Sequence, residues 1–424
     1  MKRKNTEKRK VTNDVSTPDD CSFMNILQLT NKIPYPPVDG GAIAVLNLSL
    51  GLAEMGHKVT ILAMNTDKHY SDINQIPVAV KTSVYIIPVN VHAKITFTGA
   101  LKNLLLSNLP YTGERFISTG FRKKLTGLLK ENKFDVVQIE GLYLTNYIRT
   151  VRKNSNAIIA LRSHNIEHEI WLRIAEQETN LFRKIYFKVL AKRIIALKAG
   201  IVNTYDLLVP ITQRDANVYR RFGNTRPVRV IQAGINLRDI SPNKDFTRPS
   251  VFFIGALDWI PNQEGLIWFI KNVWKGIRNK FEGLEFHIAG RNAPQKLIDF
   301  ICMEPGIVYH GEVVDSKLFI TSYRVMVVPL FSGSGMRVKI VEGMALKRLI
   351  VTTALGAEGI GAVNGEHILI AETSEEFVNA VSLALNDTDL YTNIPGNARK
   401  FIEKHFDNET ITGDLIDFYR QFTV

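Results

Sequence analysis

Two basic side chains lie close together after a glycine-containing loop. Arg337 and Lys339 follow the run 325–330, whose β-branched residues predict a strand, and they open the segment 335–347, which predicts a helix. A strand, a loop and a helix in this order present backbone N–H groups and the positive end of a helix to a phosphate. Cations in that first turn would otherwise oppose the helix dipole, so they indicate an anionic ligand.

A carboxylate on the same helix extends this site. Glu342 comes seven residues after Gly335, which is roughly 10 Å along a helix at about 1.5 Å per residue. That is about the reach from a diphosphate to a ribose, so the segment offers cations for phosphates and a carboxylate for sugar hydroxyls. The alternative interpretation is an ordinary βαβ unit with a charged, solvated helix start.

The amino-acid sequence of this segment also resembles a motif of a known protein family. GSGMRVKIVEGMA, followed by VTTALGAEGI, resembles the donor-nucleotide motif of GT-B glycosyltransferases, specifically the retaining family 4 group. The resemblance implies that Glu342 binds the ribose of a nucleotide-sugar and that Arg337 and Lys339 face its diphosphate. The family often carries a pair of glutamates eight positions apart, and in this chain Ser334 stands at the first of those two positions.

Polar side chains also follow two strands predicted in the first half of the chain. FDVVQIE ends in Glu140, and the strand 157–161 runs directly into the residues RSHNIE. Ligands bind at the carboxyl ends of parallel strands, although a single histidine after a strand is more often structural. The resemblance implies that His164 contacts the transferred sugar, and we expect Glu140 and Asn165 to contact the acceptor.

The resemblance also implies donor contacts from three further places. The glycine pair ending at Gly41 comes before a predicted helix, Arg291 follows a predicted strand, and Gly311 follows another strand that would flank the base. The complete expected donor site comprises Gly41, Arg291, Gly311, Ser334, Gly335, Arg337, Lys339 and Glu342.

The fold expected from this resemblance is α/β of the GT-B type, with two Rossmann-like doubly wound domains facing a cleft. We divide the chain into a disordered basic tail (1–22), an acceptor-side domain (23–235), a linker (236–250), a nucleotide-sugar-binding domain (251–400) and a helix returning to the first domain (401–424). The segment 401–422 reads as one amphipathic helix, and 228–232 as the last strand of the first domain.

Composition restricts the choice of partner. The net charge is +12, which suits nucleic acid, an anionic membrane or a phosphorylated substrate. No zinc-finger spacing and no aromatic-in-basic pattern is present, so nucleic acid is not an expected partner. Asp387-Thr-Asp389 spells a DxD metal motif but follows a predicted helix, so we interpret it as a loop, and we expect neither a metal ion nor a cofactor.

Cysteine content and hydropathy bear on location. Cys21 and Cys302 lie far apart, which favours a reducing compartment. No apolar run follows the basic first ten residues as in a secretory signal. The basic helix predicted at 181–203 is either a solvated face or a membrane-surface helix that would suit a lipid-linked acceptor. We expect a cytoplasmic protein. If the helix at 181–203 lies on a membrane surface, the protein would also contact the inner face of the membrane peripherally.

The sequence therefore predicts a retaining, metal-independent glycosyltransferase. It would move a sugar from a UDP- or GDP-sugar to a saccharide or lipid-linked glycan in cell-surface polysaccharide or glycoconjugate synthesis. A nucleotide-sugar epimerase on the same scaffold and a non-catalytic GT-B-like binding protein are the alternatives.

Overall fold

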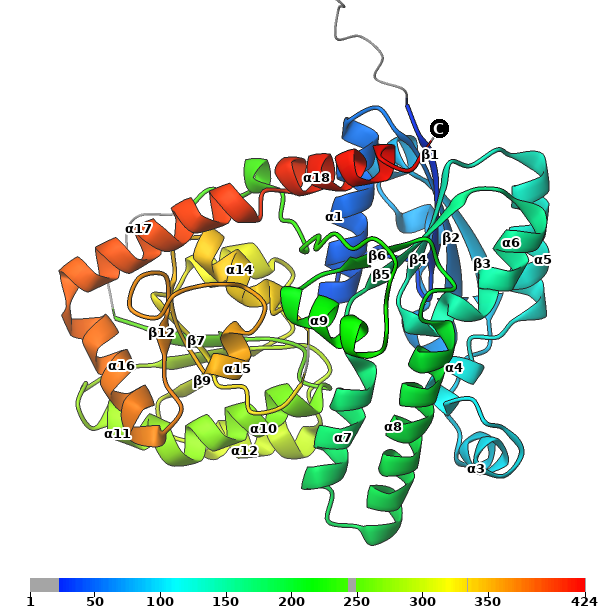
Figure 1. The fold of residues 1–424 in the computed structure, drawn as a ribbon. Helices are drawn as coiled ribbons and strands as arrows, with labels where there is room; N and C mark the ends of the chain where they lie inside the picture. The colour runs from blue at the N-terminus through cyan, green and yellow to red at the C-terminus, as the bar shows by residue number, and fades with distance from the viewer. Residues whose placement is uncertain (1–22, 243–248, 334, 424) are drawn as a thin grey trace, which may run out of the picture.

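Two parallel sheets form the centres of two lobes in the computed structural model, which describes residues 23–242, 249–333 and 335–423 (Figure 1). Within these residues each sheet has six strands. The basic tail expected at 1–22 and the expected donor residue Ser334 lie outside the described residues. The two sheets with flanking helices confirm the predicted GT-B architecture.

The first lobe is built on a sheet of order β3-β2-β1-β4-β5-β6. Apart from the partly exposed edge strand Tyr85–Val91, its strands are buried runs rich in Val, Ile and Leu, as in parallel sheets covered on both faces. They are β1 (Asn25–Thr30), β2 (Lys58–Thr66), β3 (Tyr85–Val91), β4 (Val136–Glu140), β5 (Ile158–Ser163) and β6 (Leu207–Pro210). The strand order reverses between β1 and β4, and such switch points open a crevice at the carboxyl ends of the strands.

The second lobe repeats this plan with the order β12-β11-β10-β7-β8-β9. The strand order here reverses between β10 and β7, which pair in register at Val325 and Val251. The strands are β7 (Val251–Ile254), β8 (Phe286–Ala289), β9 (Ile307–Gly311), β10 (Val325–Val328), β11 (Leu349–Thr352) and β12 (Leu369–Ile370).

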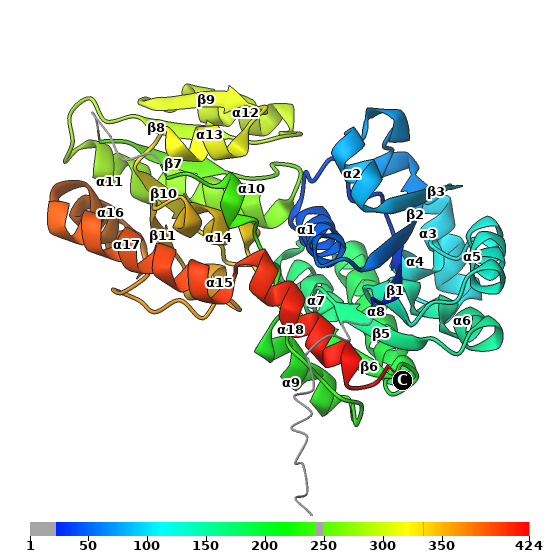
Figure 2. The same ribbon diagram turned by 90° about the horizontal axis from the view of Figure 1, so that it is seen from above.

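Helices cover both faces of each sheet (Figure 2). In the first lobe they are α1 (Gly40–Glu54), α2 (Val78–Ser83), α3 (Phe97–Leu106), α4 (Tyr111–Glu114), α5 (Thr119–Glu131), α6 (Ile148–Asn154), α7 (Glu167–Gln177), α8 (Leu181–Ile201) and α9 (Gln213–Arg221). In the second lobe they are α10 (Ile260–Phe269), α11 (Lys275–Arg278), α12 (Gln295–Met303), α13 (Ser316–Thr321), α14 (Val338–Ala345), α15 (Ala354–Ala357), α16 (Ser374–Asn386) and α17 (Thr388–His405). In the described part of the chain, no helix has the length and apolar character needed to cross a membrane.

The chain end returns to the first lobe, as the resemblance implied. Helix α18 (Asn408–Arg420) packs on α1 (Figure 1). The two helices approach so closely that a Cβ on Gly51 would lie 2.4 Å from Thr412 Oγ1. The prediction of one helix over 401–422 was wrong, because the helix breaks at Phe406. There the backbone turns aside to pair with Ile235, whose N–H donates to Phe406 O at 2.9 Å.

Two smaller predictions also need correction. The segment 228–232 runs beside β6, where the N–H of Ile231 donates to Pro210 O at 2.9 Å, but it makes only an isolated bridge at Val228 and is not a strand. Asp387 is not in a loop: it caps the start of α17, and its carboxylate accepts from the N–H of Leu390.

Candidate functional site

A cleft of about 640 Å³ lies between the two lobes. The first lobe lines it with the loop and start of α1 and with the residues that follow β5. The second lobe lines it with the loops after β7, β8 and β9 and with the start of α14. Seven side chains or glycines expected at the site line this cleft: Gly41, His164, Asn165, Arg291, Arg337, Lys339 and Glu342.

The starts of two helices face each other across the cleft. In the first lobe, Asp39 caps α1 by accepting from the N–H of Ala42 at 3.0 Å, and Lys32 Nζ holds its carboxylate at 2.5 Å. A Cβ on Gly40 would lie 3.4 Å from Val338, the first residue of α14. Two positive helix ends therefore meet where an anion would have backbone donors from both lobes.

Helix α14 begins three residues later than predicted, at Val338. Arg337 stands at the N-cap with φ −91° and ψ 86°, a non-helical conformation. Lys339 is therefore in the first turn, where its Nζ donates to Ile254 O at 3.2 Å and to Asn262 Oδ1 at 3.1 Å. It also lies over the ring of Phe253, 4.4 Å from the centroid. The late start leaves both basic groups at the helix end, as an anion site requires.

Three charged side chains at α14 have shifted pKa values. Burial, together with the charge of Arg337, lowers the pKa of Lys339 to about 7. Burial also raises the pKa of Glu342 to about 7, against the opposing charge of Lys317. Burial lowers the pKa of Arg337 to about 10, although Glu358 raises it. Ionisable groups shifted in this way and lining one cleft indicate a functional site.

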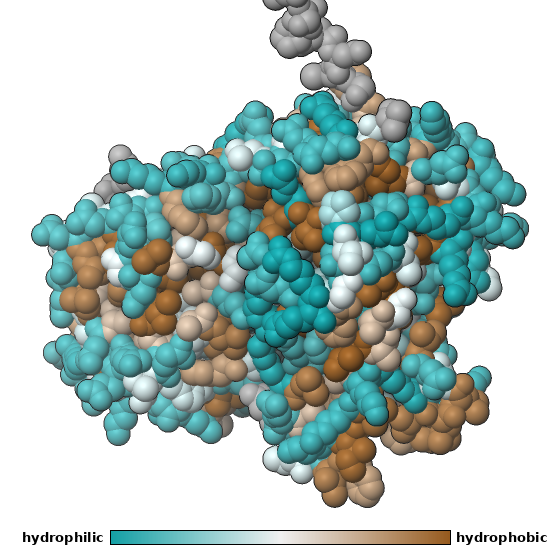
Figure 3. Space-filling view, in the orientation of Figure 1, coloured by the Kyte–Doolittle hydropathy of each residue, from teal (hydrophilic) through white to brown (hydrophobic). Residues whose placement is uncertain are grey.

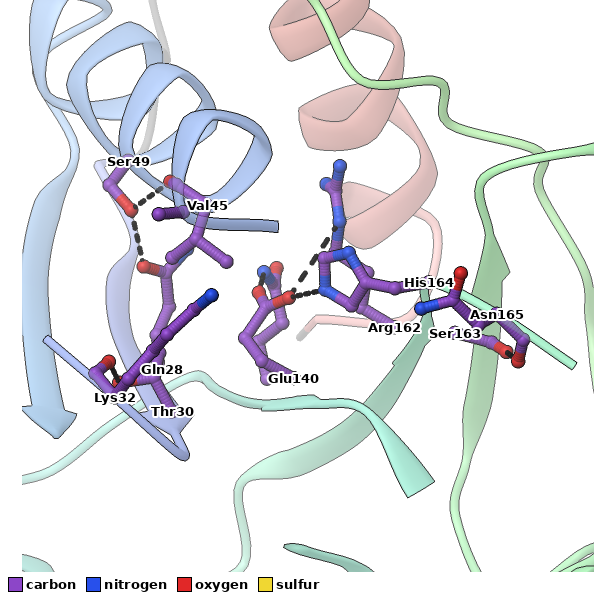
Figure 4. Close-up of polar contacts among 12 residues, drawn as sticks. Gln28, Thr30, Lys32, Val45, Ser49, Glu140, Arg162, Ser163, His164 and Asn165 are labelled. Carbon is purple, nitrogen blue, oxygen red and sulfur yellow. Dashed lines mark hydrogen bonds and ion pairs between the residues drawn. The ribbon is translucent and has the colours of Figure 1, made fainter. Parts of the chain in front are cut away.

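His164 is held by a chain of buried polar groups (Figure 4). Its Nε2 lies 2.5 Å from Glu140 Oε2. Burial would raise the pKa of Glu140, but the hydrogen bond and charge of His164 and the charge of Arg162 outweigh it and lower that pKa. Glu140 is therefore a carboxylate, and His164 Nε2–H donates to it. Glu140, the expected acceptor contact, is only 6% exposed and lies behind His164.

The series of hydrogen bonds that begins at His164 continues to helix α18. Gln138 on β4 donates from its amide nitrogen to Glu140, and its amide oxygen accepts from the hydroxyl of Tyr419 at 2.7 Å. Tyr419 lies on α18 and is completely buried. The returning helix thus fixes Gln138, which fixes Glu140, which orients His164. We refer to these four residues as the His164 relay.

A buried arginine stands beside the relay. Arg162 on β5 is fully buried, its Nε lies 3.8 Å from Glu140 Oε2, and none of its side-chain nitrogens donates a hydrogen bond to a described residue. Burial lowers its pKa and the charge of Glu140 raises it again. Arg162 thus supplies positive charge that keeps Glu140 ionised.

Contacts across the cleft join the lobes. Gly335 takes φ 82°, and a Cβ there would lie 2.3 Å from Asn165 Oδ1, so only glycine allows this approach. Arg173 on α7 donates to Gly333 O. Arg214 on α9 pairs with Glu358 across the lobes, with 2.9 Å between Nε and Oε1.

Sequence reasoning missed these last pairs. Arg173 and Arg214 lie on surface helices whose charges look like any solvated face. No sequence pattern shows that Glu169, which contacts both arginines, completes a network reaching Glu358.

The remaining expected donor residues fall in two groups. Arg291 lines the cleft after β8, and its charge helps to lower the pKa of Asp39, where burial acts in the opposite direction and Lys32 contributes most of the lowering. Gly311 does not line the cleft: it ends β9 with φ 68°, and its carbonyl accepts from Gly290 N at 2.8 Å. Gly311 therefore shapes the turn before Glu312, which does line the cleft.

The donor set suits an organic anion better than a metal ion. Within the described residues no group of three His, Cys, Asp or Glu side chains is placed to hold a metal. The cleft instead brings together two helix starts, the oriented imidazole of His164 and side chains of both charges. The basic ones are Lys68, Arg291, Arg337 and Lys339, and the acidic ones are Asp39, Asp258, Glu312 and Glu342. That the protein needs neither a metal ion nor a cofactor stays a prediction.

Family models match both lobes. Residues 38–239 match the model described as Glycosyltransferase Family 4, and residues 248–387 match the model described as Glycosyl transferases group 1. A relative from Klebsiella pneumoniae, described as an "Uncharacterized 44.6 kDa protein in cps region", is 23% identical over 92% of this chain and 98% of its own length.

Solved structures share the fold. Sucrose-phosphate synthase from Thermosynechococcus elongatus has a TM-score of 0.69 at 17% identity, with 94% of this chain and 98% of that chain covered. HepE from Anabaena in complex with UDP-glucose has a TM-score of 0.65 at 12% identity, with 94% and 100% covered. A mutant of S. aureus TarM in complex with fondaparinux, alpha-GlcNAc-glycerol and UDP has a TM-score of 0.65 at 11% identity, with 94% and 100% covered.

Proposed function

We propose a reaction for this chain, which belongs to the group 1 glycosyltransferases of GT-B fold. It moves a sugar from a UDP- or GDP-sugar to a saccharide or lipid-linked glycan, with retention at the anomeric carbon. The observation that carries this proposal is one cleft in which Arg337, Lys339 and Glu342 of the second lobe face His164 of the first. The UDP and UDP-glucose named with two structures of this fold favour UDP as the nucleotide.

The diphosphate leaving group sets the main electrostatic demand. Its charge grows as the glycosidic bond breaks, and preorganised donors at that place lower the barrier. Arg337, Lys339 and the N–H groups at the start of α14 serve the diphosphate from one lobe, and the start of α1 with Gly41 serves it from the other. Glu342 accepts hydrogen bonds from the ribose hydroxyls.

His164 contacts the transferred sugar. In the neutral imidazole, Nε2–H directed to Glu140 leaves Nδ1 as a hydrogen-bond acceptor, for which a sugar hydroxyl is a suitable donor. Asn165 serves the acceptor beside it, and the leaving phosphate takes the acceptor's proton. No side-chain nucleophile is needed in this scheme, and the closed cleft excludes water that would hydrolyse the donor.

The role in the cell is part of the same proposal. A relative described as lying in a cps region supports synthesis of a cell-surface polysaccharide or glycoconjugate. We place the protein in the cytoplasm, at the inner face of the membrane where a lipid-linked acceptor would be presented.

The test is a panel of nucleotide-sugars incubated with the protein, with and without saccharide and lipid-linked acceptors. The proposal predicts nucleotide release that depends on an acceptor and a product whose anomeric configuration, measured by NMR coupling constants, matches that of the donor. Donor epimerisation without an acceptor would establish the epimerase instead. An inverted product would refute retention.

A further inference from the structure

Helix α3 carries its apolar stripe on the outside. Phe97, Leu101 and Leu105 recur every four residues and so share one face. They are 83%, 46% and 72% exposed. The buried residue of this helix is Asn103, which is polar. A helix that packs on a protein core buries its apolar face, so α3 has the reverse arrangement.

The tip formed by α7 and α8 adds a second set of exposed apolar side chains. At the start of α8, Leu181 is 65% exposed, Phe182 83% and Ile185 52%. Figure 1 shows these two helices projecting as a hairpin beyond the rest of the first lobe, and Figure 3 shows apolar residues gathered over α3 and this tip. Large exposed apolar patches of this kind mark interaction surfaces.

The two sets lie on neighbouring elements. Arg193, near the middle of α8, donates to Asn103 Oδ1 at 2.9 Å and to Leu104 O at 2.8 Å, which fastens α3 beside α8. We call the exposed apolar residues of 94–106 and 181–185, with the basic residues around them, the apolar tip surface.

Basic charge predominates on this surface, although Glu176 and Glu178 lie at the end of α7 just before Leu181. Neither segment 94–109 nor segment 181–203 contains an acidic residue. The exposed basic residues are Lys94, Lys102, Arg183, Lys188 and Lys192. Aromatic and aliphatic side chains inserted at an interface, with cations around them, match a lipid surface that carries anionic headgroups.

A second copy of the chain fits this surface less well. Symmetric dimers bring the same patch of both subunits together. The five exposed cations would then oppose five others, which disfavours association.

Helix α7 connects this surface to the cleft. It starts at Glu167, two residues after Asn165, and its eleven residues end at Gln177, four residues before Leu181. At about 1.5 Å per residue it spans roughly 16 Å. Arg173, in the middle of α7, donates to Gly333 O on the opposite wall of the cleft. A surface bound to lipid would therefore lie about one short helix from the sugar-transfer site.

We infer that the apolar tip surface inserts into the interface of an anionic membrane and places the cleft near acceptors presented there. The inference rests on the proposed function only for the nature of the acceptor, because membrane binding itself needs no turnover. This inference differs from the interpretation of α8 as a solvated or membrane-surface basic helix, because here the side chains that insert belong to α3 and to the apolar start of α8.

Vesicle flotation of the full chain tests this inference. Vesicles of phosphatidylcholine alone are compared with vesicles that also contain phosphatidylglycerol, at low and high salt. We expect binding to the anionic vesicles that weakens as salt rises. Phe97→Ser and Phe182→Ser each lower the partition coefficient by about tenfold, the effect of withdrawing one inserted aromatic side chain. Both positions are exposed, so thermal unfolding should be unchanged.

Met303→Ser is the matched control. Met303 on α12 is 79% exposed in the other lobe, and its substitution should leave vesicle binding as in the wild type. Wild-type protein that floats with neither vesicle, or Phe variants that bind as tightly as the wild type, would overturn the inference. So would a dimer in solution that the Phe variants dissociate. Vesicle binding that persists while transfer fails in every assay would uphold this surface and count against the proposed function alone.

Discussion

Replacing Lys339 by methionine should stabilise the empty protein and weaken nucleotide binding at once. Lys339 is held at the start of α14 by Ile254 O and Asn262 Oδ1, at 3.2 and 3.1 Å. Its pKa, lowered to about 7 by burial and by Arg337, shows that the folded protein resists its charge. A negatively charged ligand bound beside Lys339 would offset that cost.

The magnitude follows from that pKa. The fall from 10.5 to about 7 corresponds to a cost of up to about 5 kcal/mol for the protonated form, at about 1.4 kcal/mol per unit. Removing the ammonium also removes two hydrogen bonds, worth about 1 kcal/mol each. Because the side chain is only partly buried, we expect a net gain of about 1–3 kcal/mol in the free energy of unfolding near pH 6.

The sign depends on pH. The folded protein holds the Lys339 proton less tightly than the unfolded chain, so the cost is complete below about pH 7 and disappears as the pH approaches the unfolded pKa of about 10.5. The advantage of Lys339→Met should therefore shrink by about 2 kcal/mol between about pH 6 and about pH 9.

The assay combines denaturant unfolding at both pH values with calorimetric titration of UDP and GDP. Loss of a charge-assisted hydrogen bond should weaken diphosphate binding by about tenfold or more. Lys275→Met is the control, because Lys275 is an exposed lysine of the same lobe and should change neither quantity. A variant less stable than the wild type near pH 6, or unchanged nucleotide affinity, would refute the reasoning.

Three further variants test the relay and the contact between the lobes. Tyr419→Phe removes the hydrogen bond to Gln138, so it should cost about 1 kcal/mol of stability and shift the pH profile of turnover, whereas an unshifted profile would limit Tyr419 to structure. Gly335→Ala should cost about 1–2 kcal/mol and lower turnover, because a φ of 82° and a contact at 2.3 Å leave no room for a Cβ; wild-type kinetics would contradict this. Arg214→Gln removes the ion pair with Glu358 and should allow the lobes to separate, which X-ray scattering would show as a larger radius of gyration. An unchanged radius would mean that this ion pair does not hold the lobes together.

Local pattern was enough to predict most strands of the two sheets and the grouping of basic and acidic residues on α14, whose role in donor binding stays a prediction. The apolar runs of the strands and the spacing of Arg337, Lys339 and Glu342 each lie within one short stretch of sequence. Their prediction therefore needed no knowledge of tertiary contacts. The start of α14 was misplaced by three residues, because glycine and a non-helical Arg337 conformation are not distinguishable from a first turn by residue type.

Contacts between distant segments could not be predicted in this way. Tyr419 and Gln138 are separated by 281 positions and meet only because α18 returns to the first lobe. The helix break at Phe406 depends on backbone pairing with Ile235. The outward apolar face of α3 also needed the structure, because its periodicity is that of any buried helix. These features belong to tertiary packing.

Titration of UDP and GDP into Glu342→Ala tests the central claim most directly. The wild type should bind at least one of the two nucleotides, and the variant should lose about 1–2 kcal/mol, or roughly five- to thirtyfold in affinity, the scale of hydrogen bonds to a charged group. Glu285→Ala, an exposed glutamate of the same lobe, should bind as the wild type does. A Glu342→Ala variant that binds the preferred nucleotide with wild-type affinity would contradict the ribose assignment, and a wild type that binds neither nucleotide would contradict the donor site itself.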